Sequence, residues 1–100
     1  MINENFEYEF TGFDPEYRIK KLVTTVGDKL YFSAPSDAFM KLAIRKSHGM
    51  IKASCRIASQ VGTFFAEGTG GNAIRAIEQL EKRIKRQLDS WKKNRFDETE

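Results

Sequence analysis

Residues 71–96 read GNAIRAIEQLEKRIKRQLDSWKKNRF, and this stretch decides the fold. Its apolar residues recur at spacings of three, four and seven, which places them on one face of an α-helix. At 100° per residue, several basic residues fall together on the opposite, exposed face. Asn72 is a suitable N-cap after a Gly-Gly break, so the helix is expected to begin near Ala73. The expected buried residues are Ile74, Ile77, Ile84, Leu88 and Trp91, and the expected basic face is Arg75, Lys82, Arg86 and Lys93, with Lys85 and Lys92 flanking it.

The bulk composition indicates one globular domain. The chain has 100 residues, of which 40% are hydrophobic and 31% charged. We expect residues 1–96 to form a single domain and 97–100 to be a frayed acidic tail. No apolar run approaches the roughly 18 residues that span a bilayer, and the acidic N-terminus is unlike a signal peptide, so a cytoplasmic protein is expected. Cys55 is the sole cysteine, which excludes an intrachain disulfide.

The charge is distributed unevenly along the chain. The net charge is only +3, but the segment 75–95 holds eight Lys or Arg residues against three acids, and acids collect towards the two chain ends. A basic face of this kind favours an anionic partner, and nucleic acid is the commonest one for a domain of this size.

The rest of the chain predicts one further helix and four strands. Alternating aromatic residues in 5–11 predict a strand, and Asp14-Pro15 is expected to start a helix with Asp14 as N-cap and Pro15 in its first turn. After turn residues 33–37, strands are expected at 38–46, 50–58 and 63–67, with a tight turn at 47–49. The order β-α-β-β-β-α predicts an α+β fold, a four-stranded sheet with two helices packed side by side on one face.

The other face of this sheet is expected to carry basic residues. They could form a second binding surface, but alternating Lys and Arg also keeps an open sheet face soluble, and we favour the latter reading. The residues concerned are Lys41, Arg45, Lys52 and Arg56.

Four segments resemble the short ribosome hibernation-promoting factors, also called ribosome-associated inhibitors. That family has an Ala-Glu strand end, an Ala-Ile-Asp step, a Lys-Leu-x-Arg-Gln-Leu helix core and an aromatic-Lys pair. The corresponding residues here are Phe65-Ala66-Glu67-Gly68, Ala76-Ile77-Glu78, Arg83-Ile84-Lys85-Arg86-Gln87-Leu88 and Trp91-Lys92. The segment from Phe10-Thr11-Gly12 to Asp14-Pro15 is similar in kind, so the likeness spans nearly the whole chain. It departs at Asn72 and Ile74, where the family has aspartate and tyrosine, and at Asp89-Ser90, where it has a basic pair.

The resemblance implies a translation inhibitor that binds small-subunit ribosomal RNA in the channel for messenger and transfer RNA. The residues that it places at RNA phosphates are Lys20, Arg83, Arg86 and Lys92, and the exposed helix face adds Arg75, Lys82 and Lys93. Phosphate contacts act through charge and hydrogen bonds, so binding is expected to weaken steeply with salt. A protein of this kind would be a monomer off the ribosome, because the dimerising extension of the family's long members has no counterpart in this sequence.

No arrangement of residues predicts catalysis, and we expect no enzyme, cofactor, metal, small-molecule substrate or membrane partner. His48 lies in a turn without predicted partners, and Cys55 alternates with apolar strand residues, which is typical of a small core residue. The glycine-rich residues 67–71 lack the Gly-Lys-Ser/Thr ending of a nucleotide-binding loop and are expected to form a strand-to-helix turn.

Two alternative functions are open at this point. Double-stranded RNA-binding domains also use an α-β-β-β-α unit, but they lack a leading strand and carry a basic cluster at the start of the last helix. A protein-protein interaction module is the other alternative, with an exposed patch drawn from Phe6, Tyr8, Phe13, Phe39 or Phe64.

Overall fold

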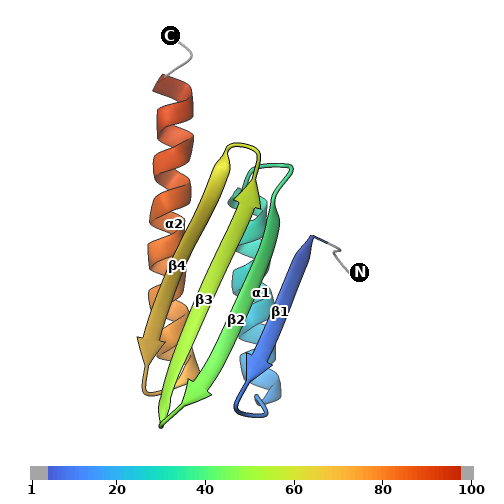
Figure 1. The fold of residues 1–100 in the computed structure, drawn as a ribbon, viewed down its shortest axis with the longest axis vertical. Helices are drawn as coiled ribbons and strands as arrows, with labels where there is room; N and C mark the ends of the chain where they lie inside the picture. Colours follow the sequence, from blue (N-terminus) through green and yellow to red (C-terminus); the bar gives the residue numbers. More distant parts are fainter. Residues whose placement is uncertain (1–4, 98–100) are drawn as a thin grey trace.

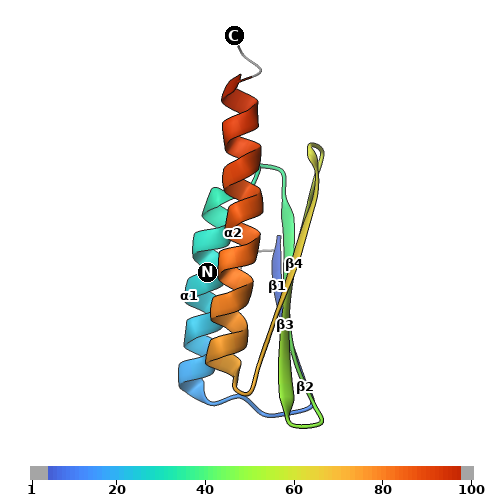
Figure 2. The same ribbon diagram turned by 90° about the vertical axis from the view of Figure 1, so that its left-hand side faces the viewer.

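A computed structural model describes residues 5–97 and, within them, the side chains of 5–94. The predicted order β-α-β-β-β-α is confirmed, and the two helices lie side by side on one face of the sheet (Figure 2). The expected tail begins at Asp97, which is the last helical residue, and its remainder lies outside the described residues. The elements are β1 (Phe6–Thr11), α1 (Tyr17–Ser33), β2 (Phe39–Ser47), β3 (Met50–Ser59), β4 (Gly62–Gly70) and α2 (Ala73–Asp97).

The sheet is mixed, with the strands in sequence order β1-β2-β3-β4 (Figure 1). β1 runs parallel to β2 because α1 returns the chain to the end where β1 began, whereas β2, β3 and β4 form an antiparallel meander. The β2–β3 turn has His48 at φ 53° and Gly49 at φ 76°. Positive φ at two successive residues is the geometry that fits a two-residue hairpin to the twist of its strands, which confirms the predicted turn.

The core lies between the sheet and the helices, and the strand alternation predicted for β2 and β3 is confirmed. Residues pointing towards the helices are at most 5% exposed, and those between them face solvent. From α2, Leu80 joins the predicted core residues. The central buried side chains are Met40, Leu42, Ile44, Ala53, Cys55 and Ile57 from the sheet, Val23 and Leu30 from α1, and Ile77, Leu80, Ile84 and Leu88 from α2.

The start of α1 differs from the prediction. The helix begins at Tyr17 rather than at Pro15, and its N-cap is Glu16, whose side chain makes no capping hydrogen bond. The Glu16 carbonyl accepts the first helical bonds, from Ile19 and Lys20. Asp14 and Pro15 instead belong to the connection in which Phe13 packs edge to face on Phe10, with ring centroids 6.1 Å apart. Asp14 and Pro15 thus follow this aromatic contact as part of the connection and precede the first helical turn.

β4 extends three residues beyond its predicted end at residue 67. Gly68 and Gly70 are strand residues and not part of a turn, because β4 continues to residue 70. A Cβ at Gly68 would overlap the backbone of α2 at Ala76, so the absence of a side chain lets the helix lie directly against the strand. Asn72 is confirmed as a cap: its Oδ1 accepts a hydrogen bond from the Arg75 N–H at 2.9 Å.

For one residue of the predicted apolar face of α2, Ile74, the prediction of burial is wrong. Ile74 is 36% exposed, because it lies about 80° around the helix from Ile84, at the rim of the buried face rather than over the sheet. Trp91 is half-buried and packs edge to face on Phe64, with centroids 6.0 Å apart. The buried face of α2 therefore extends from Ala73 to Trp91 but passes beside Ile74.

Candidate nucleic-acid interface

The exposed basic face of α2 is the largest concentration of positive charge on the helical side of the molecule. We call Arg75, Lys82, Arg86 and Lys93 the outer stripe; all four are exposed. They stand opposite Ile84, which is fully buried over the sheet. At 1.5 Å per residue the stripe is about 27 Å long. Among the described side chains, none of the four forms an ion pair. The exposed acids Glu78 and Asp89 lie three or four residues from them along the helix and offset part of the charge, so the outer stripe keeps a net positive charge.

The side of α2 next to α1 holds two further lysines. Lys85 and Lys92 are seven residues apart and therefore share this side of the helix. Lys85 lines a hollow between the helices together with Phe32 of α1, and Lys92 is half-buried. Close by, Glu81 pairs with Lys29 of α1 at 3.8 Å, which offsets part of the charge. The inter-helix side is thus less positive than the outer stripe.

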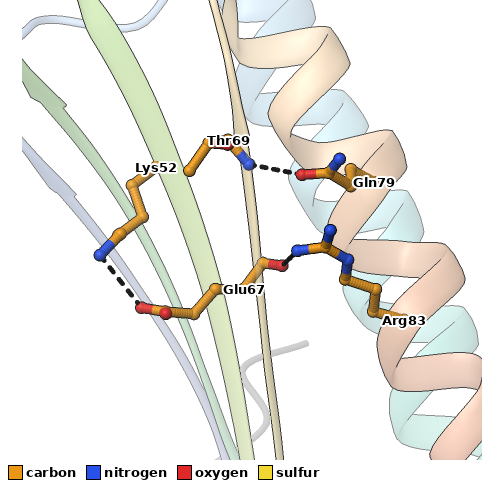
Figure 3. Close-up of polar contacts among 5 residues, drawn as sticks. All are labelled: Lys52, Glu67, Thr69, Gln79 and Arg83. Atoms are coloured by element: carbon orange, nitrogen blue, oxygen red, sulfur yellow. Dashed lines mark hydrogen bonds and ion pairs between the residues drawn. The ribbon is translucent and has the colours of Figure 1, made fainter.

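The opposite side of α2 is bonded to the free edge of β4. Gln79, Arg83 and Gln87 are spaced four residues apart and reach alternate residues of the strand. Figure 3 shows the contacts of Gln79 and Arg83. Gln79 Oε1 accepts from the Thr69 N–H at 2.8 Å, and Arg83 Nη1 donates to the Glu67 carbonyl at 2.8 Å. We call this set of contacts the edge ladder.

Gln87 completes the edge ladder with two bonds to one strand residue. Its Oε1 accepts from the Phe65 N–H at 3.2 Å, and its Nε2 donates to the Phe65 carbonyl at 2.7 Å. An open strand edge is a template for pairing with another chain, and these side chains occupy it. Arg83, predicted from the resemblance to contact RNA, is exposed but already holds β4 with one of its five N–H groups.

Lys20 lies apart from the outer stripe. Gly27, seven residues later and on the same side of α1, packs against the ring of Phe6 in β1. Lys29, nine residues after Lys20 and therefore on the opposite side, faces α2 through Glu81. Lys20 is exposed on the flank of α1 next to β1, so a partner that contacts both Lys20 and the outer stripe must cover the full width of the two helices.

The open sheet face carries the four predicted basic residues, but two of them are paired. Lys41 bonds Glu9 at 3.1 Å, and Lys52 bonds Glu67 at 3.4 Å (Figure 3). The hydrogen bond from Lys41, then its charge, then a hydrogen bond from Thr11, lower the pKa of Glu9 below its usual value. These acids reduce the attraction of the open sheet face for a polyanion, which supports the interpretation that its charges serve solubility.

The candidate reactive residues are placed as the sequence suggested. Cys55 is fully buried, and desolvation raises the pKa of its thiol to about 12, so it stays protonated at neutral pH. His48 is exposed in the β2–β3 turn. Among the described residues no cluster of His, Cys, Asp or Glu has the geometry to hold a metal ion, and no described helix is long and apolar enough to cross a membrane.

The aromatic residues considered for a protein-binding patch do not gather on one surface. Phe6, Phe13 and Phe64 pack partly against the core. Tyr8 and Phe39 are 46% and 40% exposed, but strand alternation places Tyr8 on the helical side and Phe39 on the open side of the sheet.

Comparison with known proteins identifies the class of fold. No protein-family model matches the sequence, and a search of curated proteins also finds no match. The structure, however, is similar to that of the Thermus thermophilus Protein Y N-terminal domain, with a TM-score of 0.72 and 13% identity over 85% of this chain and 94% of that one. It is also similar to a ribosomal subunit interface protein from Coxiella burnetii, with a TM-score of 0.68 and 12% identity over 87% and 97% of the two chains.

The chain therefore has the fold of these two proteins, over nearly their whole length. The resemblance to the hibernation-promoting factors that the sequence suggested is confirmed as a structural match. At 12–13% identity the likeness concerns the fold, and the roles of individual side chains come from this chain's own geometry.

Proposed function

We propose that this protein is a non-enzymatic, cytoplasmic translation inhibitor that binds small-subunit ribosomal RNA through the exposed faces of its helices, in the channel for messenger and transfer RNA. The observation that carries the proposal is the outer stripe, a row of four exposed cations about 27 Å long, none of which forms an ion pair among the described side chains. The fold it shares with a ribosomal subunit interface protein supports the ribosome as the source of the RNA.

The chemistry of the outer stripe favours binding to phosphates over reading of bases. Long Arg and Lys side chains in a row match a phosphate backbone, and A-form RNA hides its base edges in a deep groove. Four phosphate contacts give a slope of about −2.8 to −3.6 for log affinity against log salt. Raising monovalent salt from 50 to 200 mM should thus weaken binding about 50- to 150-fold.

Fractionation of stationary-phase cells on a sucrose gradient tests the proposal directly. The protein is expected to sediment with small subunits or whole ribosomes in low salt and to leave them in high salt. Its absence from both fractions in low salt would refute the assignment to the ribosome.

A pair of charge-reversal variants tests which surface makes the contact. Lys82→Glu/Arg86→Glu removes two phosphate contacts, and at 0.1 M salt this should cost about 60-fold in affinity for isolated small subunits. Arg45→Glu/Arg56→Glu makes the same change of charge on the open sheet face. It should have little effect, because a Debye length of about 10 Å screens charges across the sheet. Equal losses in both variants, or none in either, would contradict the outer stripe as the binding surface.

The structure gives less support to the alternative function of a double-stranded RNA-binding domain. β1 is paired with β2 along all six of its residues, and double-stranded RNA-binding domains have no such leading strand. The start of α2 carries Arg75 alone and no basic cluster. A duplex of arbitrary sequence should bind less tightly than the small subunit at equal salt.

A further inference from the structure

A hollow lies beside the outer stripe, between α2 and the β3–β4 hairpin. α2 projects past this end of the sheet (Figure 1). The hollow is bounded by the second half of α2 and by the β3–β4 hairpin, and its volume is about 640 Å³. Pockets for drug-sized ligands span roughly 300–1,000 Å³, and a single nucleotide is a ligand of that size. The hollow does not contain the edge ladder, except for Gln87 at its floor.

One wall of the hollow is apolar and aromatic. Trp91 is half-buried and meets Phe64 edge to face, at an angle of 65° between the rings. Val61, at the tip of the hairpin, also lines the hollow and is 57% exposed. Nucleobases pack favourably on aromatic side chains whatever their sequence, because every base has a π-face.

The other wall is polar and positive. Arg86 of the outer stripe lines the hollow, and Ser90 and Asn94 provide a hydroxyl and an amide next to it. No acidic residue contributes to the lining among the residues that the structure describes. Lys82 and Lys93, one and two turns away on the same face, extend the positive charge beyond the hollow. A ligand with one flat apolar part and one anionic part is complementary to these two walls.

We propose that the hollow receives one unpaired nucleotide of the bound RNA, with its base against Trp91 and Val61 and its phosphate at Arg86. The proposal rests on RNA binding by the outer stripe and adds a preference for single-stranded over duplex RNA. A base in a duplex is stacked inside the helix and cannot enter, whereas a base in a loop or an unpaired strand can turn outwards.

The sole tryptophan of the chain provides a direct readout. Binding of a fluorescein-labelled 12-nucleotide oligouridylate at 50 mM salt is followed by anisotropy, and the intrinsic fluorescence of Trp91 is measured with unlabelled RNA in parallel. Single-stranded RNA should quench this fluorescence, whereas a 12-base-pair duplex should raise the anisotropy without quenching. If single-stranded RNA binds and leaves the fluorescence unchanged, the hollow is not its site and the proposal fails.

A matched pair of variants locates the quenching. Val61→Asp places a negative charge in the hollow, and Met50→Asp places the same charge on the hairpin at the other end of the sheet, where Met50 is 52% exposed. Val61 lies in a turn, which aspartate suits, and Met50 is an exposed residue at the very start of β3, so both variants are expected to fold, which circular dichroism checks. Val61→Asp should lower single-strand affinity roughly 5- to 150-fold and reduce quenching at equal saturation, with Met50→Asp unchanged.

Equal quenching in the two variants would overturn the proposal. If the proposed function itself is wrong, the result is a different one: wild-type protein binds neither the labelled RNA nor small subunits.

Discussion

Replacing Gly68 by alanine is expected to lower the free energy of unfolding by about 2–3 kcal/mol. A Cβ at this position would lie 2.6 Å from the Leu80 amide nitrogen and would overlap the Ala76 carbonyl oxygen. Both are backbone atoms of α2, so no side-chain rotation relieves the overlap, and the helix must move away from β4. Overpacking costs typically 1–3 kcal/mol. The upper part of that range applies because the shift also strains the bonds of Gln79 and Arg83 to the strand.

Thermal and urea unfolding followed by circular dichroism measure this loss. For a domain of this size, 2–3 kcal/mol corresponds to a fall in Tm of roughly 10–20 °C. Gly71→Ala is the matched control, since a Cβ at Gly71 meets no atom within 4 Å. It should leave the free energy of unfolding unchanged, or raise it by about 0.4–1 kcal/mol because alanine lowers the conformational entropy of the unfolded chain. If Gly68→Ala were as stable as Gly71→Ala, α2 could not lie as close to β4 as described.

Three further predictions concern single side chains. Gln87→Glu keeps the shape but loses the donor to the Phe65 carbonyl, so it should cost about 1–3 kcal/mol in urea unfolding; an unchanged midpoint would contradict the edge ladder. Cys55 should not react with a thiol reagent at pH 8 until the protein unfolds, and prompt labelling of folded protein would refute its burial and raised pKa. The pKa of Glu9, from an NMR titration, should lie below 4.5 and return towards 4.5 in Lys41→Met. Because this pKa is lowered in the folded state, the stabilisation by Lys41 is present above pH 4.5 and is lost as the pH falls through the folded value.

The main elements and the outer stripe could be predicted from the sequence because both depend on local periodicity. Apolar residues at helical spacing in 71–96 determine which face of α2 is buried, and the basic residues opposite them must then face solvent. Alternation in β2 and β3 works in the same way. Asn72 was predictable as a cap because its side chain bonds an amide only three residues away.

The contacts between elements could not be predicted in this way. Arg83 was interpreted only as an RNA contact, because nothing local says that its side of α2 lies along the edge of β4. The spacing Gln79, Arg83, Gln87 is a signal in retrospect: long polar side chains that can hydrogen-bond to backbone groups, at intervals of four beside the buried face. The separation of Lys20 from the outer stripe likewise depends on which flank of α1 meets β1. The hollow at Trp91 is formed by residues of α2 and of the β3–β4 hairpin, which are more than twenty residues apart in the sequence.

The edge ladder also determines how the molecule opens. Edge-strand amides normally exchange hydrogen readily with solvent, but the amides of Thr69 and Phe65 are bonded to side chains of α2. They become free only when the helix leaves the strand, so β4 and α2 up to Gln87 should open as one cooperative unit. The last turns of α2 project beyond the sheet (Figure 1), and the edge ladder ends at Gln87, so opening of these turns does not require release of the strand. The end of the helix can therefore adapt its shape to a partner while the sheet and the rest of the helix stay closed.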